Sequence, residues 1–139
     1  MIPQFNKLGY LSKGIHNVSL NDIKKRFGSG NSWRKYLFKK LESFVELLSR
    51  NKENVERLLV NGSFVTDKET PNDIDCILVV KNSFDFRSKD AKKLINAKKQ
   101  FNIHLQTFTE DDKGEFKGFL DLFSHDRDRN PKGLLEVKL

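Results

Sequence analysis

The fold of this chain is decided by two short stretches, Val60-Asn61-Gly62-Ser63-Phe64 and Pro71-Asn72-Asp73-Ile74-Asp75-Cys76-Ile77. The first closes the segment 55–60, which contains Leu58, Leu59 and Val60, with Asn-Gly-Ser, a pattern typical of a strand that ends in a tight turn. The second leads into residues 74–80, which are β-branched and nearly continuously apolar. Such a run predicts a central strand that is buried on both faces. A sheet therefore lies at the centre of the predicted fold.

Helices are predicted before and after these strands. Ser19 is placed to open a short helix over about 20–27, together with an acidic residue three positions later. A long helix follows from Ser32, its expected cap, to about residue 50. Its apolar side chains recur every three or four positions: Trp33, Leu37, Leu41, Phe44, Leu47 and Leu48. Its polar face is expected to carry Arg34, Lys39, Lys40, Glu42 and Glu46. A third helix is predicted over about 88–99, opened by Ser88 or Asp90.

The remaining segments complete an α/β or α+β pattern. Residues 102–108 have the alternation of a half-exposed strand, with Ile103, Leu105 and Thr107 on one side and His104, Gln106 and Phe108 on the other. Residues 118–123 predict a short helical turn, and 133–139 predict a last strand. The first 18 residues are expected to form an irregular arm. We therefore expect a single domain over 1–139, with a mixed sheet of about four strands backed by helices and two helices near its N-terminus.

The composition of the chain indicates which kinds of partner and which cellular compartment to expect. The chain has 26 Lys and Arg against 19 Asp and Glu, a net charge of +7. This charge favours polyanionic partners such as nucleotides or RNA, although lysines on helix surfaces also serve solubility alone. A single cysteine, Cys76, leaves no internal disulfide and is expected to be a small core residue in a reducing cytoplasm. No apolar run is long enough to span a membrane, and the first residues do not resemble a secretory signal, so we expect no membrane partner.

The aspartates at the start of the central strand indicate a metal site. Residues two apart on a strand point to the same side, so Asp73 and Asp75 are expected to project together. Two carboxylates this close repel one another unless a cation lies between them. Carboxylate oxygens are preferred ligands of Mg²⁺, which usually also binds substrate phosphates. In the turn before, Gly62 allows close approach of main-chain N–H groups to an anion, and Ser63 adds a hydroxyl. The alternative is a plain turn followed by two structural aspartates.

These residues resemble the nucleotidyltransferase superfamily related to DNA polymerase β. Its hallmark is a Gly-Ser pair followed about ten residues later by Asp-x-Asp and an apolar strand, as in Gly62-Ser63 and Asp73-Ile74-Asp75. The fuller pattern is similar to the minimal nucleotidyltransferase-like proteins of bacteria, and in particular to one uncharacterised branch of them. The similarity is carried also by Gly14-Ile15-His16, Arg26-Phe27-Gly28 and Pro131-Lys132-Gly133-Leu134-Leu135-Glu136.

The resemblance implies a nucleotidyltransferase-type mixed sheet and transfer of an NMP from an NTP, with ATP the first expectation, to a protein or RNA acceptor such as tRNA. Asp73 and Asp75 would be the catalytic and metal-binding residues for Mg²⁺ or Mn²⁺. Gly62 and Ser63 would hold the β- and γ-phosphates, and Lys68 is placed to neutralise phosphate charge. Small relatives of this type often act as toxins or antitoxins of bacterial pairs.

One departure from the family pattern concerns a third carboxylate on the neighbouring strand. The strand over 102–108 offers His104 and Gln106 there, and Asp111, Asp112 and Asp121 are the acidic candidates. The loop around His125 is expected to be a charged turn rather than a second site. Three functions therefore stay open: an active transferase, a nucleotide- or partner-binding module that has lost its chemistry, and a basic RNA-binding protein with a structural acidic pair.

Overall fold

The protein was analysed as a computed structural model that describes residues 2–139. Its strands are β1 (Ile15–Val18), β2 (Val55–Asn61), β3 (Ile74–Val80), β4 (Ile103–Thr109) and β5 (Leu134–Val137). Its α-helices are α1 (Leu20–Phe27), α2 (Ser32–Ser49), α3 (Lys89–Ile95), α4 (Ala97–Phe101) and α5 (Lys113–Phe123). Two 3₁₀ turns, η1 (Lys52–Asn54) and η2 (Ser63–Val65), flank β2.

The strands form one mixed sheet in the order β1-β5-β2-β3-β4. β2 runs antiparallel to β3 and β5, whereas β1 pairs with β5, and β3 with β4, in parallel. The expected mixed α/β sheet and the two N-terminal helices are therefore confirmed. The sheet has one strand more than expected, because β1 lies inside the segment predicted to be irregular. This strand is only four residues long and pairs with the other end of the chain.

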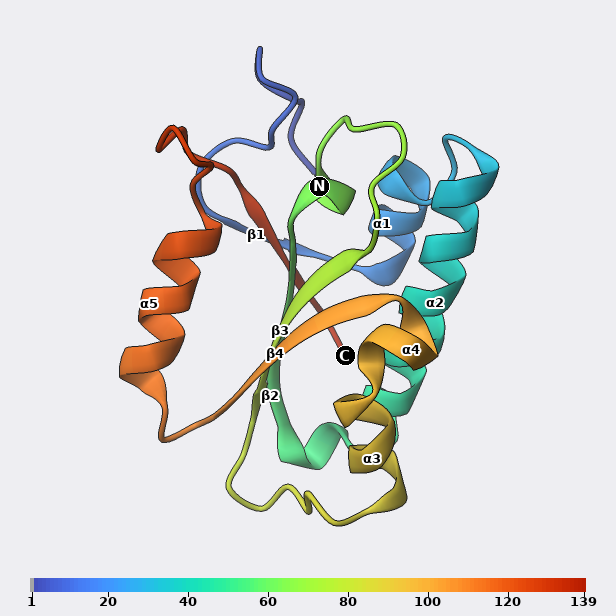
Figure 1. Cartoon of the computed structure of the whole chain (residues 1–139), viewed down its shortest axis with the longest axis vertical. Helices are drawn as coiled ribbons and strands as arrows, with labels where there is room; N and C mark the ends of the chain where they lie inside the picture. Colours follow the sequence, from blue (N-terminus) through green and yellow to red (C-terminus); the bar gives the residue numbers. More distant parts are fainter. Residues whose placement is uncertain (1) are drawn as a thin grey trace.

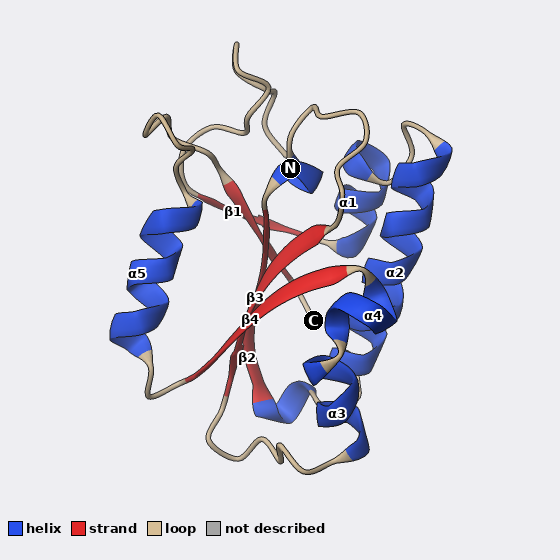
Figure 2. Ribbon diagram, viewed as in Figure 1, coloured by secondary structure: helices blue, strands red, loops and turns tan. Residues whose placement is uncertain are grey.

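Helices cover the two faces of the sheet unequally. Helices α1 to α4 lie on one face and α5 lies alone on the other (Figures 1 and 2). The larger core fills the first interface, and β3 contributes Ile74, Cys76, Leu78 and Val80 to it. A smaller cluster lies under α5 and contains Leu59, Ile77 and Phe108. The central strand β3 is therefore buried on both faces, as predicted.

Phe108 differs from the sequence-based expectation. Its side of β4 was expected to be exposed, yet the residue is 5% exposed because α5 covers it. The reason is that α5 is a full helix of 11 residues rather than a short turn over 118–123. A second difference in this half of the chain is the break at Asn96, which divides the predicted third helix into α3 and α4.

The caps of α1 and α2 explain where these helices begin. Ser19 and Asp22 form the predicted reciprocal box at the start of α1, with main-chain to side-chain distances of 3.1 and 3.0 Å. In α2 the cap is Asn31 and not Ser32, because the Asn31 Oδ1 atom accepts the Arg34 main-chain N–H at 2.8 Å. The predicted apolar stripe of α2 faces the core, but Arg34 is buried with it instead of lying on the polar face.

Within residues 2–139, no helix combines the length and the apolar composition that a bilayer crossing requires.

Candidate functional site

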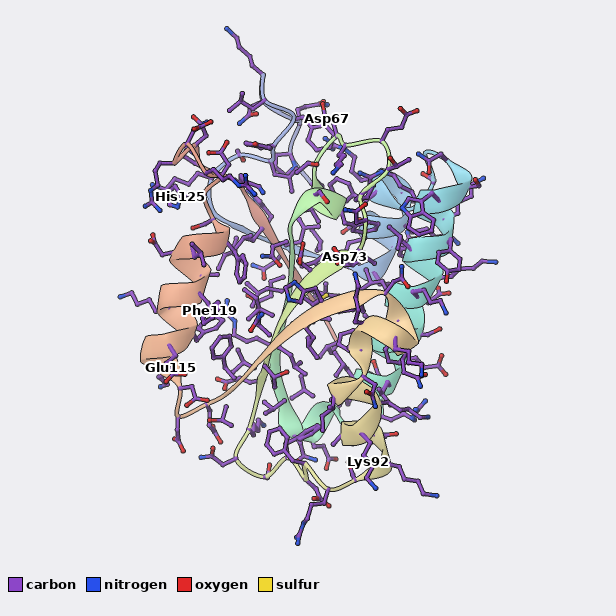
Figure 3. All side chains as sticks on the ribbon, in the orientation of Figure 1. Asp67, Asp73, Lys92, Glu115, Phe119 and His125 are labelled. Carbon is purple, nitrogen blue, oxygen red and sulfur yellow. The ribbon has the colours of Figure 1, made fainter. Side chains whose placement is uncertain are left out.

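The two aspartates lie where the chain enters β3. Asp75 is the second residue of the strand, and it faces the same side of the sheet as Ile77, the side that carries α5. Asp73 precedes the strand by one residue, and Figure 3 shows it near the end of the sheet. The side chains of Asp73 and Asp75 are 22% and 26% exposed, so both are largely but not fully removed from water.

Gly62 brings the preceding turn directly against this pair. β2 and β3 pair so that Asn61 lies opposite Asp75, which leaves Gly62 just beyond the last paired residue. Gly62 has φ = +77°, and a Cβ atom at this position would overlap the Asp75 carboxylate at Oδ2. Both facts require glycine here, one for the backbone conformation and one for the space. The main chain of the Gly-Ser turn therefore lies against one of the two carboxylates.

Each aspartate has one cationic or titratable neighbour. The Lys98 ammonium on α4 lies 2.5 Å from Asp73 Oδ2. Asp75 lies opposite His104 in the parallel β3–β4 register, and its Oδ1 atom is 3.1 Å from His104 Nδ1. The sequence placed His104 on the neighbouring strand, where a third carboxylate was expected, and gave no reason to include Lys98 in the site. The spacing of residues gave no signal for Lys98, because it reaches Asp73 only through the packing of α4.

The electrostatics of the pair favour a cation. Burial raises the pKa of the Asp75 carboxyl, and the charge of Asp73 raises it further, while His104 and the more distant Lys132 offset part of this increase. Asn61 lies opposite Asp75 in the β2–β3 register, is 1% exposed, and has an Oδ1 atom without a hydrogen-bond partner within residues 2–139. Two carboxylates and an unpaired amide oxygen at one end of the sheet are a donor set that suits a hard divalent cation.

The loop after Gly62 is held by a residue that sequence reasoning placed on the wrong face of α2. The Arg34 guanidinium is buried, and it donates hydrogen bonds to the main-chain oxygens of Phe27, Phe64, Thr66 and Lys68 at 2.5 to 3.2 Å. These bonds join the start of α2 to the turn and to the loop that follows. The signal was present in the sequence, since Arg34 lies three residues before Leu37 and so extends the apolar stripe.

Ser63 and Lys68 lie in this loop. Ser63 is the first residue of η2 and is partly exposed, and its carbonyl accepts a hydrogen bond from the Thr66 hydroxyl at 2.7 Å. Lys68 is exposed, and its main-chain N–H donates to Thr66 Oγ1 at 3.2 Å. Among the residues that the structure describes, the Lys68 ammonium has no carboxylate within ion-pair distance.

None of the three acidic candidates for a third carboxylate joins the pair. Asp111 and Asp112 follow the far end of β4, roughly 20 Å along the sheet from its start beside Asp75. Asp112 accepts hydrogen bonds from Thr109, and Asp111 accepts one from Asn82. Asp121 lies on α5 beside Arg129 and His125. Within residues 2–139, no group of three or more His, Cys, Asp or Glu side chains is arranged to hold a metal ion.

The other residues considered for a site are His125, Gln106 and Cys76. The ring of His125 is within 2.9 Å of the Asp121 carbonyl, in the turn that Asp126 organises through hydrogen bonds to Asp128 and Asn130. Gln106 follows His104 on the same side of β4, opposite Ile77. Cys76 is 1% exposed, and this burial raises the pKa of its thiol, so it is a core residue and not a nucleophile.

Comparison with known proteins places the chain in a family. No curated protein matches it. A crystal structure of a putative nucleotidyltransferase from Sulfolobus solfataricus is similar at 21% sequence identity, covering 63% of this chain and 83% of that chain, with a TM-score of 0.40. A likeness this weak says nothing about function. Residues 3–138 match the model of a family described as a family of unknown function, DUF6932, and the chain therefore belongs to this family.

Proposed function

We propose that this protein is a Mg²⁺- or Mn²⁺-dependent nucleotidyltransferase that moves an NMP from an NTP, with ATP the first expectation, to a protein or RNA acceptor. The observation that carries the proposal is the contact between the main chain of Gly62 and the Asp75 carboxylate. It brings an anion-binding type of turn and a cation-binding pair of acids to one point. A purely structural turn does not require a buried carboxylate against its glycine.

The residues present suit a divalent cation. Asp73 and Asp75 supply carboxylate oxygens, and Asn61 supplies a buried amide oxygen that has no hydrogen-bond donor within residues 2–139. When bound, the cation would neutralise the charge that develops on the phosphates during transfer. Lys98 would leave Asp73 or turn toward a phosphate oxygen, since an ammonium and a metal ion compete for the same carboxylate.

The turn and its loop would bind the triphosphate. The main chain at Gly62 and Ser63 approaches the acids closely, so its N–H groups and the Ser63 hydroxyl are placed to bind phosphate oxygens. Lys68 is exposed and lies six residues further along the same loop, where its charge would meet the outer phosphates. The buried Arg34 keeps this loop in place without touching the substrate.

Transfer requires an acceptor hydroxyl to attack the α-phosphorus while the bond to the bridging oxygen breaks and pyrophosphate leaves. The hydroxyl must lose its proton, and His104 is the titratable group beside Asp75 that can accept it. Asp75 would hold the ring through Nδ1, which leaves Nε2 for the acceptor. Since nucleoside triphosphates are made inside the cell, the proposal also places the protein in the cytoplasm.

A second candidate is a module on the same fold that binds a nucleotide or a partner and performs no transfer. It is favoured by the two side chains that already accompany the acids, Lys98 at Asp73 and His104 in place of a third carboxylate. The charges of such a site are partly balanced without a metal ion.

Transfer from labelled NTPs distinguishes the two candidates. Wild type, an Asp73→Asn/Asp75→Asn variant and an Asp121→Asn control would be incubated with each of four α-labelled NTPs, Mg²⁺ or Mn²⁺, and either tRNA or cell extract. The transferase predicts label on an acceptor with wild type and control but not with the double variant. Metal-dependent nucleotide binding without transfer supports the module. Absence of both contradicts the proposed function.

A further inference from the structure

A hydrophobic cavity lies beside the outer strand of the sheet, away from the Gly-Ser turn. It has a volume of about 310 Å³ and opens between β4, the helices α3 and α4, and the loop that leads from β3 to α3. Its apolar lining includes Phe84, Phe86, Leu94 and Ile95, with Ile103 and Leu105 from β4. Two of these side chains are exposed to an unusual degree for their size, Phe86 at 48% and Ile95 at 74%. Exposed apolar side chains that gather around a cavity make this surface a candidate for docking.

The strand next to this cavity has an unpaired edge. β4 is the last strand of the sheet order, so one of its edges has no strand partner in the part of the chain that is described. Proteins usually protect such edges with lysines, prolines or bulges. β4 has the sequence Ile-His-Leu-Gln-Thr-Phe-Thr and pairs with β3 over its whole length without a register shift. The main-chain N–H and C=O groups on its free edge are therefore available to an added strand, whose alternate side chains would enter the cavity.

The positive charge around the cavity indicates what kind of molecule would bind there. Residues 81–100, which form the loop, α3 and most of α4, contain seven basic and two acidic residues, a net charge of +5 in a chain whose total is +7. Figure 3 shows one of the lysines, Lys92, on the outer side of α3. A second copy paired through β4 would bring two such positive surfaces together, which is unfavourable. An acidic partner would be attracted to the same surface.

We propose that the β4 edge and this cavity bind an extended segment of a partner protein, with apolar side chains at alternate positions and acidic residues beside them. A nucleic acid would use the lysines but would leave the strand edge and the aliphatic lining unmatched. The surface reaches the proposed nucleotide site only through Lys98 and His104, which line the cavity and contact Asp73 and Asp75. The inference does not depend on the proposed nucleotidyl transfer.

Selection from a random twelve-residue peptide library displayed on phage tests this inference directly. The enriched sequences are expected to be acidic and to alternate apolar with other residues. The peptides are expected to bind Ile95→Asp or Phe86→Asp at least about tenfold more weakly than wild type. Each substitution removes an apolar side chain from the cavity and places a negative charge next to the acidic peptide. Leu122→Asp is the matched control, since Leu122 is 59% exposed on α5 and lies outside the cavity.

The structural readout is amide protection in β4, which should increase on peptide binding over residues 103–107. The Asp73→Asn/Asp75→Asn variant should still bind the peptides, because neither aspartate lines the cavity, so a failure of the transferase leaves this result unaffected. Thermal melts of each variant would verify folding. The inference is overturned if no peptide is enriched, or if Ile95→Asp and Phe86→Asp bind as wild type does. It is also overturned if labelled poly(U) RNA protects β4 while peptides do not, or if Ile95→Asp abolishes self-association in sedimentation velocity.

Discussion

Asp75 lies against Gly62 with a second carboxylate two residues away, so its ionised form is held in a place that water reaches only in part. Burial and Asp73 raise its pKa above the ordinary value of 3.8. The folded protein therefore binds this proton more tightly than the unfolded chain does. It follows that the Asp75 contribution to the free energy of unfolding decreases as the pH rises from about 3.8 through the raised pKa, and stays lost above it.

The first prediction follows from this linkage. Asp75→Asn removes the charge, so without divalent cations it should melt at a higher temperature than wild type at pH 7. The difference should shrink as the pH falls to 3.8 and below. Adding Mg²⁺ or Mn²⁺ should raise the melting temperature of wild type and leave the variant unchanged. Differential scanning calorimetry with Asp121→Asn as control checks this, and a lower melting temperature for Asp75→Asn at pH 7 would contradict it.

Among residues outside the apolar core, we expect substitution of Arg34 to lower the free energy of unfolding most. Arg34→Met keeps much of the aliphatic part of the side chain. It removes the hydrogen-bond donors for the main-chain oxygens of Phe27, Phe64, Thr66 and Lys68. We expect the free energy of unfolding in urea to fall by about 3 kcal/mol, because buried acceptors are left unpaired. Lys35→Met, at the exposed neighbouring position, should change it by less than about 0.5 kcal/mol. Equal effects of the two substitutions would show that the hydrogen bonds of Arg34 do not hold the loop.

Among the elements of the fold, α5 is attached to the sheet by partly buried side chains alone. None of its residues is fully buried, and it rests on Leu59, Ile77 and Phe108 through four half-buried side chains. Figure 3 shows one of these, Phe119, pointing from α5 toward the sheet. Gly114 and Gly118 lower its intrinsic stability by about 1 kcal/mol each relative to alanine. We therefore expect α5 to open without unfolding of the sheet.

Hydrogen exchange measures this local opening. Amides of residues 113–123 should exchange faster than those of α2 and β3, and Phe119→Ala should accelerate the exchange of α5 by about tenfold or more. Leu122→Ala, on the exposed side of the same helix, is the control and should leave the rate nearly unchanged. If α5 exchanged at the rate of β3, the helix would be part of the same cooperative unit.

At the scale of the whole molecule, Cys76 reports on the integrity of the sheet. It lies on β3, between β2 and β4, and is 1% exposed, and burial raises the pKa of its thiol. A thiol reagent should therefore label Cys76 only when the sheet opens, at a rate that rises with urea as global unfolding does. In a Ser29→Cys variant one thiol should react at once and the other slowly. Rapid labelling of Cys76 in native buffer would show that β3 is accessible in the folded protein.

Local sequence patterns predicted the helices and strands in which apolar residues follow a clear pattern. They missed the elements that are stable only through contacts with segments far away in the sequence. α2 and β3 were predicted because a stripe at spacings of three and four, or an uninterrupted apolar run, leaves few alternatives. β1 was missed because a four-residue edge strand is stable only beside β5. The length of α5 was underestimated because Gly114 and Gly118 weaken its helical pattern. The predicted exposure of Phe108 was wrong because α5 covers this side of β4.

The candidate site divides in the same way. Local sequence is enough to predict that Asp73 and Asp75 project together after a glycine turn, because both features follow from the geometry of a few consecutive residues. The folded chain was needed to establish that Gly62 touches Asp75, that His104 and Lys98 contact the acids, and that Arg34 holds the loop. These contacts join segments far apart in the chain, and their geometry is set by strand register and helix packing, which no local pattern encodes.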